Sequence, residues 1–125
     1  MVYLMVLKNK DRKKYIEKFT KSAGDAFFYT EYILGGRFEA GEKIISTDPH
    51  WSWCYANLLG ERWEMGEKAI ATDASSSVFY AYYVLRGRFE LGEEAINKNP
   101  KCKENYEKSV LNDKNVKQGK KIALQ

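Results

Sequence analysis

Residues 36–42 read Gly-Arg-Phe-Glu-Ala-Gly-Glu, and this heptapeptide returns twice along the chain. It becomes Glu-Arg-Trp-Glu-Met-Gly-Glu at 61–67 and Gly-Arg-Phe-Glu-Leu-Gly-Glu at 87–93, so the spacings are 25 and 26 residues. A fixed period of this size is typical of repeat arrays, in which one supersecondary unit stacks on copies of itself. Such arrays present surfaces more often than they carry out chemistry, so the repeat directs attention to binding.

Each copy carries the signals of two short helices. An Asp or Asn, followed in two cases by Pro, precedes a helix at Asp48, Asp73 and Asn99, as is typical of a helix N-terminus. We predict first helices over 24–34, 49–59, 74–85 and 101–111, and second helices over 37–46, 62–71 and 88–97. Helices of about ten residues are unstable alone in water, so each must bury its apolar face on a neighbour.

These signals predict an all-α fold, an α-solenoid of about five short two-helix repeats that forms a single domain over residues 1–125. Residues 1–22 form a basic N-terminal capping unit, 23–99 hold three clear repeats, and 100–125 form a basic, degenerate C-terminal capping unit. The chain has 44% hydrophobic residues, enough for a continuous core. Its two cysteines lack metal-like spacing, so we expect free thiols in a reducing cytoplasm.

Positions that repeat between copies predict the scaffold. Phe28, Trp53 and Phe79 form an aromatic column in the first helices. A mid-helix glycine costs about 1 kcal/mol relative to alanine, so its return indicates close approach of a neighbouring helix. Arginines beside recurring glutamates predict an Arg–Glu ladder between stacked repeats. The predicted inter-repeat residues are Arg37, Arg62, Arg88, Glu42, Glu67, Glu93, Gly41, Gly66 and Gly92.

The best copy, at 80–96, reads Tyr-Ala-x-x-Val-Leu-x-Gly-Arg-Phe-Glu-Leu-Gly-Glu-x-Ala-Ile. This pattern resembles a short helical repeat found in small proteins of tailed bacteriophages, clearly over 28–99 and faintly at both ends. The function of that repeat is mostly unassigned, so the resemblance transfers no active site. It implies a phage origin and an interaction role in the cytoplasm of an infected bacterium, by analogy with small counter-defence and host-takeover proteins such as anti-CRISPR proteins.

No residue set in the sequence nominates a reaction or a cofactor. His50 and Cys54 stand four residues apart on a predicted helix and could offer two metal ligands, but no further ligand is in sight. The carboxylate pairs that recur in all three copies suit structure better than acid–base catalysis, which needs one special pair. We therefore expect no catalytic residue, no metal and no cofactor, and a role other than that of an enzyme.

Positions that vary between copies are free to contact a partner. They lie early in the first helices, where large aromatic residues with a polar tip are typical interface anchors. We predict a partner-binding set of Trp51, Tyr55, Tyr82, His50 and Glu31. The alternative for Trp51 is that it fills a gap between units.

The charge distribution supplies two hypotheses about the partner. Residues 1–22 carry a net charge of +5, residues 23–97 carry −6, and residues 98–125 carry +5. In the first hypothesis, a protein-binding inhibitor or adaptor meets the basic surface of a host protein, such as a nucleic-acid-binding or defence-system protein, through its acidic middle. In the alternative, the basic ends bind nucleic acid through Lys8, Lys10, Arg12, Lys13, Lys14, Lys117, Lys120 and Lys121.

The same polarity leaves two further readings open. Basic ends and acidic middles on identical chains attract each other, so a homo-oligomer is a third alternative, whereas solvated caps at the ends of a solenoid would carry no function. A membrane partner is not expected, because the opening apolar run Met1–Leu7 is much shorter than the roughly 20 residues that span a bilayer. We expect that run to form a packing helix, and the alternative is an anchor at a membrane interface.

Overall fold

The computed structural model describes residues 9–112, with side chains from Arg12 onward. This part of the chain consists of helices and turns without a β-strand, so the prediction of an all-α fold is confirmed. The first element, α2 (Asn9–Phe19), packs against the two helices that follow it. The predictions for Met1–Leu7, for the side chains of Lys8 and Lys10, and for the C-terminal unit beyond residue 112, with Lys117, Lys120 and Lys121, lie outside the described residues.

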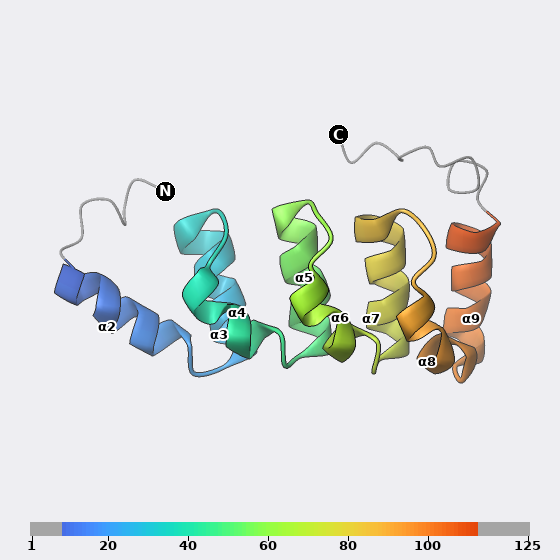
Figure 1. Ribbon diagram of the computed structural model, residues 1–125, viewed down its shortest axis with the longest axis horizontal. Helices are drawn as coiled ribbons and strands as arrows, with labels where there is room; N and C mark the ends of the chain where they lie inside the picture. Colours follow the sequence, from blue (N-terminus) through green and yellow to red (C-terminus); the bar gives the residue numbers. More distant parts are fainter. Residues whose placement is uncertain (1–8, 113–125) are drawn as a thin grey trace.

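After α2 the helices come in pairs, a first helix followed by a shorter second helix. The first helices are α3 (Ala23–Tyr29) with the π-helical turn η1 (Thr30–Leu34), α5 (Pro49–Leu59), α7 (Ala74–Phe79) with η2 (Tyr80–Leu85), and α9 (Pro100–Tyr106) with η4 (Glu107–Leu111). The second helices are α4 (Glu39–Ile45), α6 (Glu64–Ile70), and the 3-10 turn η3 (Glu90–Gly92) continuing into α8 (Glu93–Asn97). We number the pairs α3–α4, α5–α6 and α7–α8 as units 1, 2 and 3, and α9 begins unit 4. Figure 1 shows them side by side along the long axis of the molecule.

Side-chain caps begin the first helix of every unit. Asp48 and Asp73 each accept a hydrogen bond from the backbone N–H three residues later, at 2.9 Å, and Ser22 and Asn99 do the same at 3.1 Å. Each cap satisfies one of the N–H groups that a helix start leaves without an intrahelical partner. The predicted bounds of the first helices are therefore close to the observed ones, because capping is a local property of the sequence.

The difference between the 25- and 26-residue spacings arises from the π-helical turns. The N-caps stand 26 residues apart across units 1 and 3, whose first helices end in η1 and η2, and 25 apart across unit 2, whose α5 stays α-helical to Leu59. A π-turn holds one more residue than an α-turn. Copies aligned on their N-caps therefore differ by one residue in register from copies aligned on their second-helix motifs. Alignment on the N-caps places Tyr29, Tyr55, Tyr80 and Tyr106 in one column.

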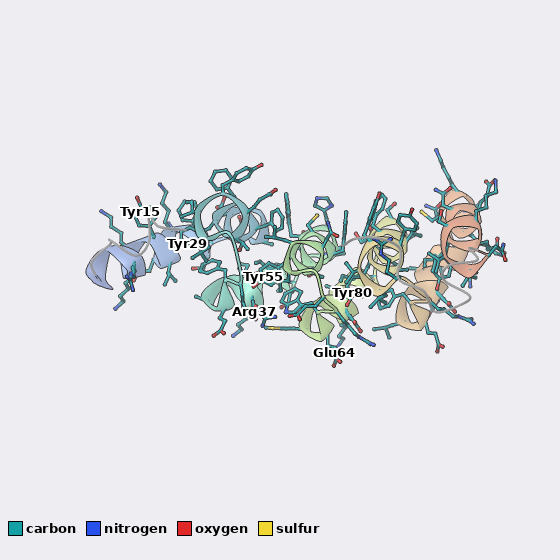
Figure 2. The ribbon with its side chains drawn as sticks, turned by 90° about the horizontal axis from the view of Figure 1, so that it is seen from above. Tyr15, Tyr29, Arg37, Tyr55, Glu64 and Tyr80 are labelled. Atoms are coloured by element: carbon teal, nitrogen blue, oxygen red, sulfur yellow. The ribbon has the colours of Figure 1, made fainter. Side chains whose placement is uncertain are left out.

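The core lies between the row of first helices and the row of second helices. Tyr55, Tyr80 and the isoleucines Ile45, Ile70 and Ile96 are fully buried there. The ring of Tyr55 meets that of Trp63 at 4.7 Å, and the ring of Tyr80 meets that of Phe89 at 5.0 Å. Figure 2 shows Tyr55 and Tyr80 between the two rows of helices.

The recurring glycines lie where the two helices of one unit cross. A Cβ at Gly66 would lie 2.9 Å from the Cβ of Ser52 on α5, and one at Gly92 would lie 2.7 Å from that of Ser77 on α7. Gly41 stands in the same relation to Ala26, at 3.1 Å. The prediction of close approach is correct, but the neighbour is the first helix of the same unit. The expected inter-repeat role of these glycines is wrong, because the helix that leaves no room belongs to their own repeat.

Candidate interaction surface

Buried tyrosine hydroxyls join consecutive units. The hydroxyl of Tyr55 in unit 2 donates a hydrogen bond to the carboxylate of Glu42 at 2.6 Å and accepts one from the backbone N–H of Phe38 at 2.9 Å, both in unit 1. Tyr80 repeats this pattern with Glu67 at 2.5 Å and Trp63 at 3.0 Å. The same bonds join Tyr106 to Glu93 at 2.7 Å and to Phe89 at 2.9 Å. Each hydroxyl therefore uses its donor and an acceptor site across the boundary between units.

An arginine holds each of these carboxylates from the same unit. Arg62 donates to Glu67 from Nε at 2.7 Å and from Nη2 at 3.0 Å, and Arg88 binds Glu93 in the same way at 2.6 and 3.0 Å. The predicted Arg–Glu pairs exist, but the expectation that they cross between repeats is wrong for these two. The glutamates stand five residues after the arginines on one unit, and the tyrosine makes the crossing instead.

Arg37 forms the loosest of these pairs and also reaches the next unit. Its Nη1 lies 3.4 Å from Glu42, and its Nη2 lies 3.2 Å from Glu61 in the turn of unit 2. Its guanidinium is therefore shared between the two carboxylates. Because the side chains of Arg37 and Glu61 are well exposed, their pair contributes little stability by itself.

Burial, and the hydrogen bond to a glutamate, raise the pKa values of Tyr55, Tyr80 and Tyr106 well above the usual value for tyrosine. The hydroxyls therefore stay protonated and remain donors at neutral pH. Tyr55 was predicted to contact a partner, and this prediction is wrong because the residue is fully buried. The error follows from the register: when the copies are aligned on the second-helix motif, Tyr55 appears to vary, although it belongs to the invariant tyrosine column.

Trp51 packs across the boundary between units 1 and 2. Its ring lies 5.2 Å from that of Phe27, and a Cβ added at Gly24 would lie 3.3 Å from its indole nitrogen. These contacts match the alternative in which Trp51 fills a gap between units. Tyr82 is half-buried, with the Arg86 guanidinium 5.6 Å from its ring centre.

His50 and Glu31 are exposed, as a surface role requires. The Cys54 sulfur lies 3.8 Å from Nε2 of His50. Burial and the nearby carboxylates of Glu31 and Asp48 raise the pKa of Cys54 to about 11, so this sulfur stays a thiol near neutral pH. Within residues 9–112, no group of three His, Cys, Asp or Glu side chains is placed to hold a metal ion.

The largest exposed aromatic groups lie on the first helices of units 1 and 3, and the half-buried Trp53 of unit 2 packs against the second pair. Phe28 and Tyr32 are 49% and 62% exposed, and their rings lie 4.9 Å apart. Phe79 and Tyr83 are 42% and 38% exposed, and Trp53 of unit 2 lies 5.0 Å from the first and 6.0 Å from the second. We call Phe28, Tyr32, Trp53, Phe79 and Tyr83 the aromatic strip.

Sequence reasoning assigned Phe28, Trp53 and Phe79 to the scaffold because aromatic residues recur there, but Phe28 and Phe79 are surface residues. A signal was available: Phe28 with Tyr32, and Phe79 with Tyr83, each stand four residues apart on one helix face. Two aromatic rings at this spacing cover more of the helix surface than a short helix needs to bury against its neighbours.

Some of the acidic residues in the middle of the chain stabilise the fold. Asp48 and Asp73 cap helices, and Glu42, Glu67 and Glu93 bind the interface tyrosines. Asp25 and Glu31, both exposed, flank Phe28 on the first helix of unit 1. The acidic groups that remain free to meet a partner therefore include two beside the aromatic strip.

The basic N-terminal end is described from Arg12 onward. Lys13 and Lys14 are exposed on α2, together with Arg12 and Lys18, and Lys21 is exposed just after this helix. They form a basic surface at one end of the row of helices, away from Trp53 and the rest of the strip in units 2 and 3 (Figure 1).

A scan against models of protein families matched none of them, and searches of curated proteins and of solved structures returned no significant match. Among the residues that the structure describes, no helix has the length and apolar character needed to cross a membrane.

Proposed function

We propose that this chain is a protein-binding solenoid without enzymatic activity, and that a partner protein docks on its aromatic strip. The observation that carries the proposal is the exposure of Phe28, Tyr32, Phe79 and Tyr83 on the first helices of the array. Rings exposed together on one surface mark interaction sites more often than single exposed apolar residues do. Aromatic side chains also dominate the energetic centres of protein interfaces.

The scaffold suits such a role because its units are tied to each other by specific bonds. Tyr55, Tyr80 and Tyr106 each lock one unit to the carboxylate and backbone of the unit before it. A surface held in this way is preorganised, so binding loses little conformational entropy. Trp53, Phe79 and Tyr83 then form one continuous surface across the boundary between units 2 and 3, and Phe28 and Tyr32 form a second ring pair on unit 1.

The chemistry around the strip favours a partner with basic residues beside an apolar patch. Asp25 and Glu31 flank the ring of Phe28, and both are exposed. Complementary charge speeds association and orients the partner. The resemblance to repeats of tailed phages makes a protein of the bacterial host the first class of partner to test. By binding it, the chain would act as an inhibitor of that protein or as an adaptor.

The test compares capture of bacterial proteins by three forms of the tagged chain, with and without nuclease. The strip variant carries Phe28→Ser and Tyr83→Ser. The control variant carries Met65→Ser and Leu91→Ser, which removes apolar side chains that are 51% and 60% exposed on the second helices. We expect a discrete protein to be retained after nuclease treatment by the natural chain and by the control, and its recovery to fall by about tenfold or more with the strip variant.

Two results would contradict the proposal. Equal recovery of the partner by the strip variant and the natural chain would remove the aromatic strip from the interface. Recovery only of nucleic acid and its attached proteins, lost with nuclease, would favour the basic end around Lys13 and Lys14. Far-ultraviolet circular dichroism of each variant checks that the helices are retained.

A further inference from the structure

The exposed ring pairs of the aromatic strip lie on either side of α5. The first helices of units 1 and 3 both end in a π-turn, so they align position by position, and their exposed ring pairs correspond: Phe28 to Phe79 and Tyr32 to Tyr83. Helix α5 lies between them, in contact with both α3 and α7. Figure 2 shows the first helices in one row, with side chains pointing away from the second helices. A two-fold rotation about an axis parallel to α5 would therefore place the ring pair of unit 1 opposite that of unit 3 in a second chain.

The same alignment places opposite charges at corresponding positions. Glu31 corresponds to Tyr82, and the guanidinium of Arg86 lies over the Tyr82 ring, 5.6 Å from its centre. Glu31 is exposed, and neither its carboxylate nor the Arg86 guanidinium forms an ion pair with another described side chain. Unit 1 therefore carries a negative charge where unit 3 carries a positive one.

The backbone at Arg86 indicates that its side chain has a function. Its φ is 55°, in the left-handed region, whereas the corresponding residue of unit 1 is Gly35, with a φ of 70°. A residue with a Cβ in this region is less stable than glycine by roughly 1 kcal/mol. Nε of Arg86 is also buried without a hydrogen-bond partner among the described residues. Strained backbone and unsatisfied polar groups concentrate at functional sites, so Arg86 is a candidate for contact with a partner.

We propose that the aromatic strip binds a second copy of this chain, in a dimer whose two-fold axis runs parallel to the first helices and passes beside α5. The ring pair of unit 1 in one chain then faces the ring pair of unit 3 in the other. Glu31 of each chain meets Arg86 of the other, so the charged contact forms twice. A two-fold interface needs a surface that is complementary to itself, and the strip with its two flanking charges has this property.

A second copy has the chemistry that the strip favours, which is a basic residue beside an apolar patch. Arg86 supplies the basic group, and the ring of Tyr82 beneath it lies 4.8 Å from that of Tyr83. This inference rests on the proposed use of the strip as a docking surface, where a host protein would compete with the second copy. Five rings from each chain form an interface at the lower end of the usual size range, so we expect a dissociation constant on the order of 10 μM.

Sedimentation equilibrium of the full chain, over about 1 to 300 μM, measures this association. We expect a reversible equilibrium between one chain and two. Arg86→Glu or Glu31→Arg alone places like charges at both contacts of the dimer and should weaken it by about tenfold or more. Lys68→Glu is the matched control for Arg86→Glu. It makes the same change of charge at an exposed residue of α6 and should leave association within about twofold.

A mixture of the two reversal variants provides the decisive comparison. Each variant repels a copy of itself, but when the Arg86→Glu chain meets the Glu31→Arg chain, both contacts again join opposite charges. We expect the mixture to form a heterodimer within about threefold of the natural affinity. Recovery of association also shows that both variants fold, because an unfolded chain presents no strip.

Four results would overturn the proposal. The natural chain could stay single at about 300 μM, or form assemblies larger than two, as contacts between basic ends and acidic middles would give. Lys68→Glu could weaken association as much as Arg86→Glu does, or the mixture could fail to associate. A chain that stays single leaves the capture of a host protein untouched, since the strip is then free. Conversely, a dimer that captures no host protein would leave this inference standing and remove the proposed function.

Discussion

At the scale of single residues, the tyrosine hydroxyl distinguishes the interior interfaces from the N-terminal one. Tyr55, Tyr80 and Tyr106 each satisfy a glutamate carboxylate and a backbone N–H across the unit boundary, and Tyr29 makes neither bond within the described side chains. A buried polar group without a hydrogen-bond partner destabilises the folded state. A Tyr→Phe substitution should therefore lower the free energy of unfolding by different amounts at these positions.

Removing the hydroxyl of Tyr80 should lower the free energy of unfolding by about 1–3 kcal/mol. The variant Tyr80→Phe keeps the ring but leaves the carboxylate of Glu67, which is 6% exposed, and the N–H of Trp63 without their shared partner. Urea denaturation followed by circular dichroism measures the change.

The matched control is Tyr29→Phe, which we expect to change the free energy of unfolding by less than about 0.5 kcal/mol. A loss at Tyr29 equal to that at Tyr80 would mean that the two hydroxyls have equivalent surroundings. That result would contradict the distinction between the interior and N-terminal interfaces.

At the scale of elements, the sequence predicted where the helices lie but not their register. The caps Asp48 and Asp73 and the terminal glycines Gly35 and Gly60 act locally, so the first helices could be located from them. The π-turns η1 and η2 have no comparably clear signal, because they add one residue to a helix without ending it. The second helices each begin two residues later than predicted, after Phe38, Trp63 and Phe89.

Gly66 permits the close crossing of α5 and α6, so we expect Gly66→Ala to destabilise the protein. A Cβ there would lie 2.6 Å from the ring of the buried Trp63 and 2.9 Å from Ser52. This overpacking should cost about 1–3 kcal/mol net, although alanine has the better helix propensity by about 1 kcal/mol. Thermal and urea denaturation report the loss.

Gly36→Ala is the matched control, because no atom lies within 4 Å of the position its Cβ would take, and its backbone does not require glycine. We expect this variant to stay within about 0.5 kcal/mol of the natural chain. If Gly66→Ala is neutral or stabilising while Gly36→Ala is neutral, helix propensity outweighs packing at the crossing.

At the scale of the whole molecule, each described first helix contacts the next one along the chain, α3 with α5, α5 with α7, and α7 with α9. Stability in such an arrangement is approximately a sum of unit and neighbour terms, so damage should stay local. We expect Tyr106→Phe, which breaks the bond between α9 and Glu93, to speed amide exchange in α8 and α9 and to leave α3 and α4 unchanged.

Hydrogen exchange followed by nuclear magnetic resonance measures this residue by residue, with Tyr55→Phe as the comparison. The second variant should speed exchange around α4 and α5 instead, because Tyr55 bonds to Glu42 in α4. Uniform acceleration over all units by either variant would show that the protein unfolds as one cooperative body.

The sequence by itself determined the helical class, the repeat and most helix bounds, because caps, glycines and short apolar periods act within a few residues of chain. It also identified the recurring Arg62 and Glu67 as structural, although not the tyrosine that joins them to the next unit. Which aromatic residues are buried was decided only in the tertiary structure. Tyr55 lies in the core and Phe28 lies on the surface. The π-turns of units 1 and 3 hide the tyrosine column when the copies are aligned at a fixed period, and burial depends on contacts with the neighbouring unit.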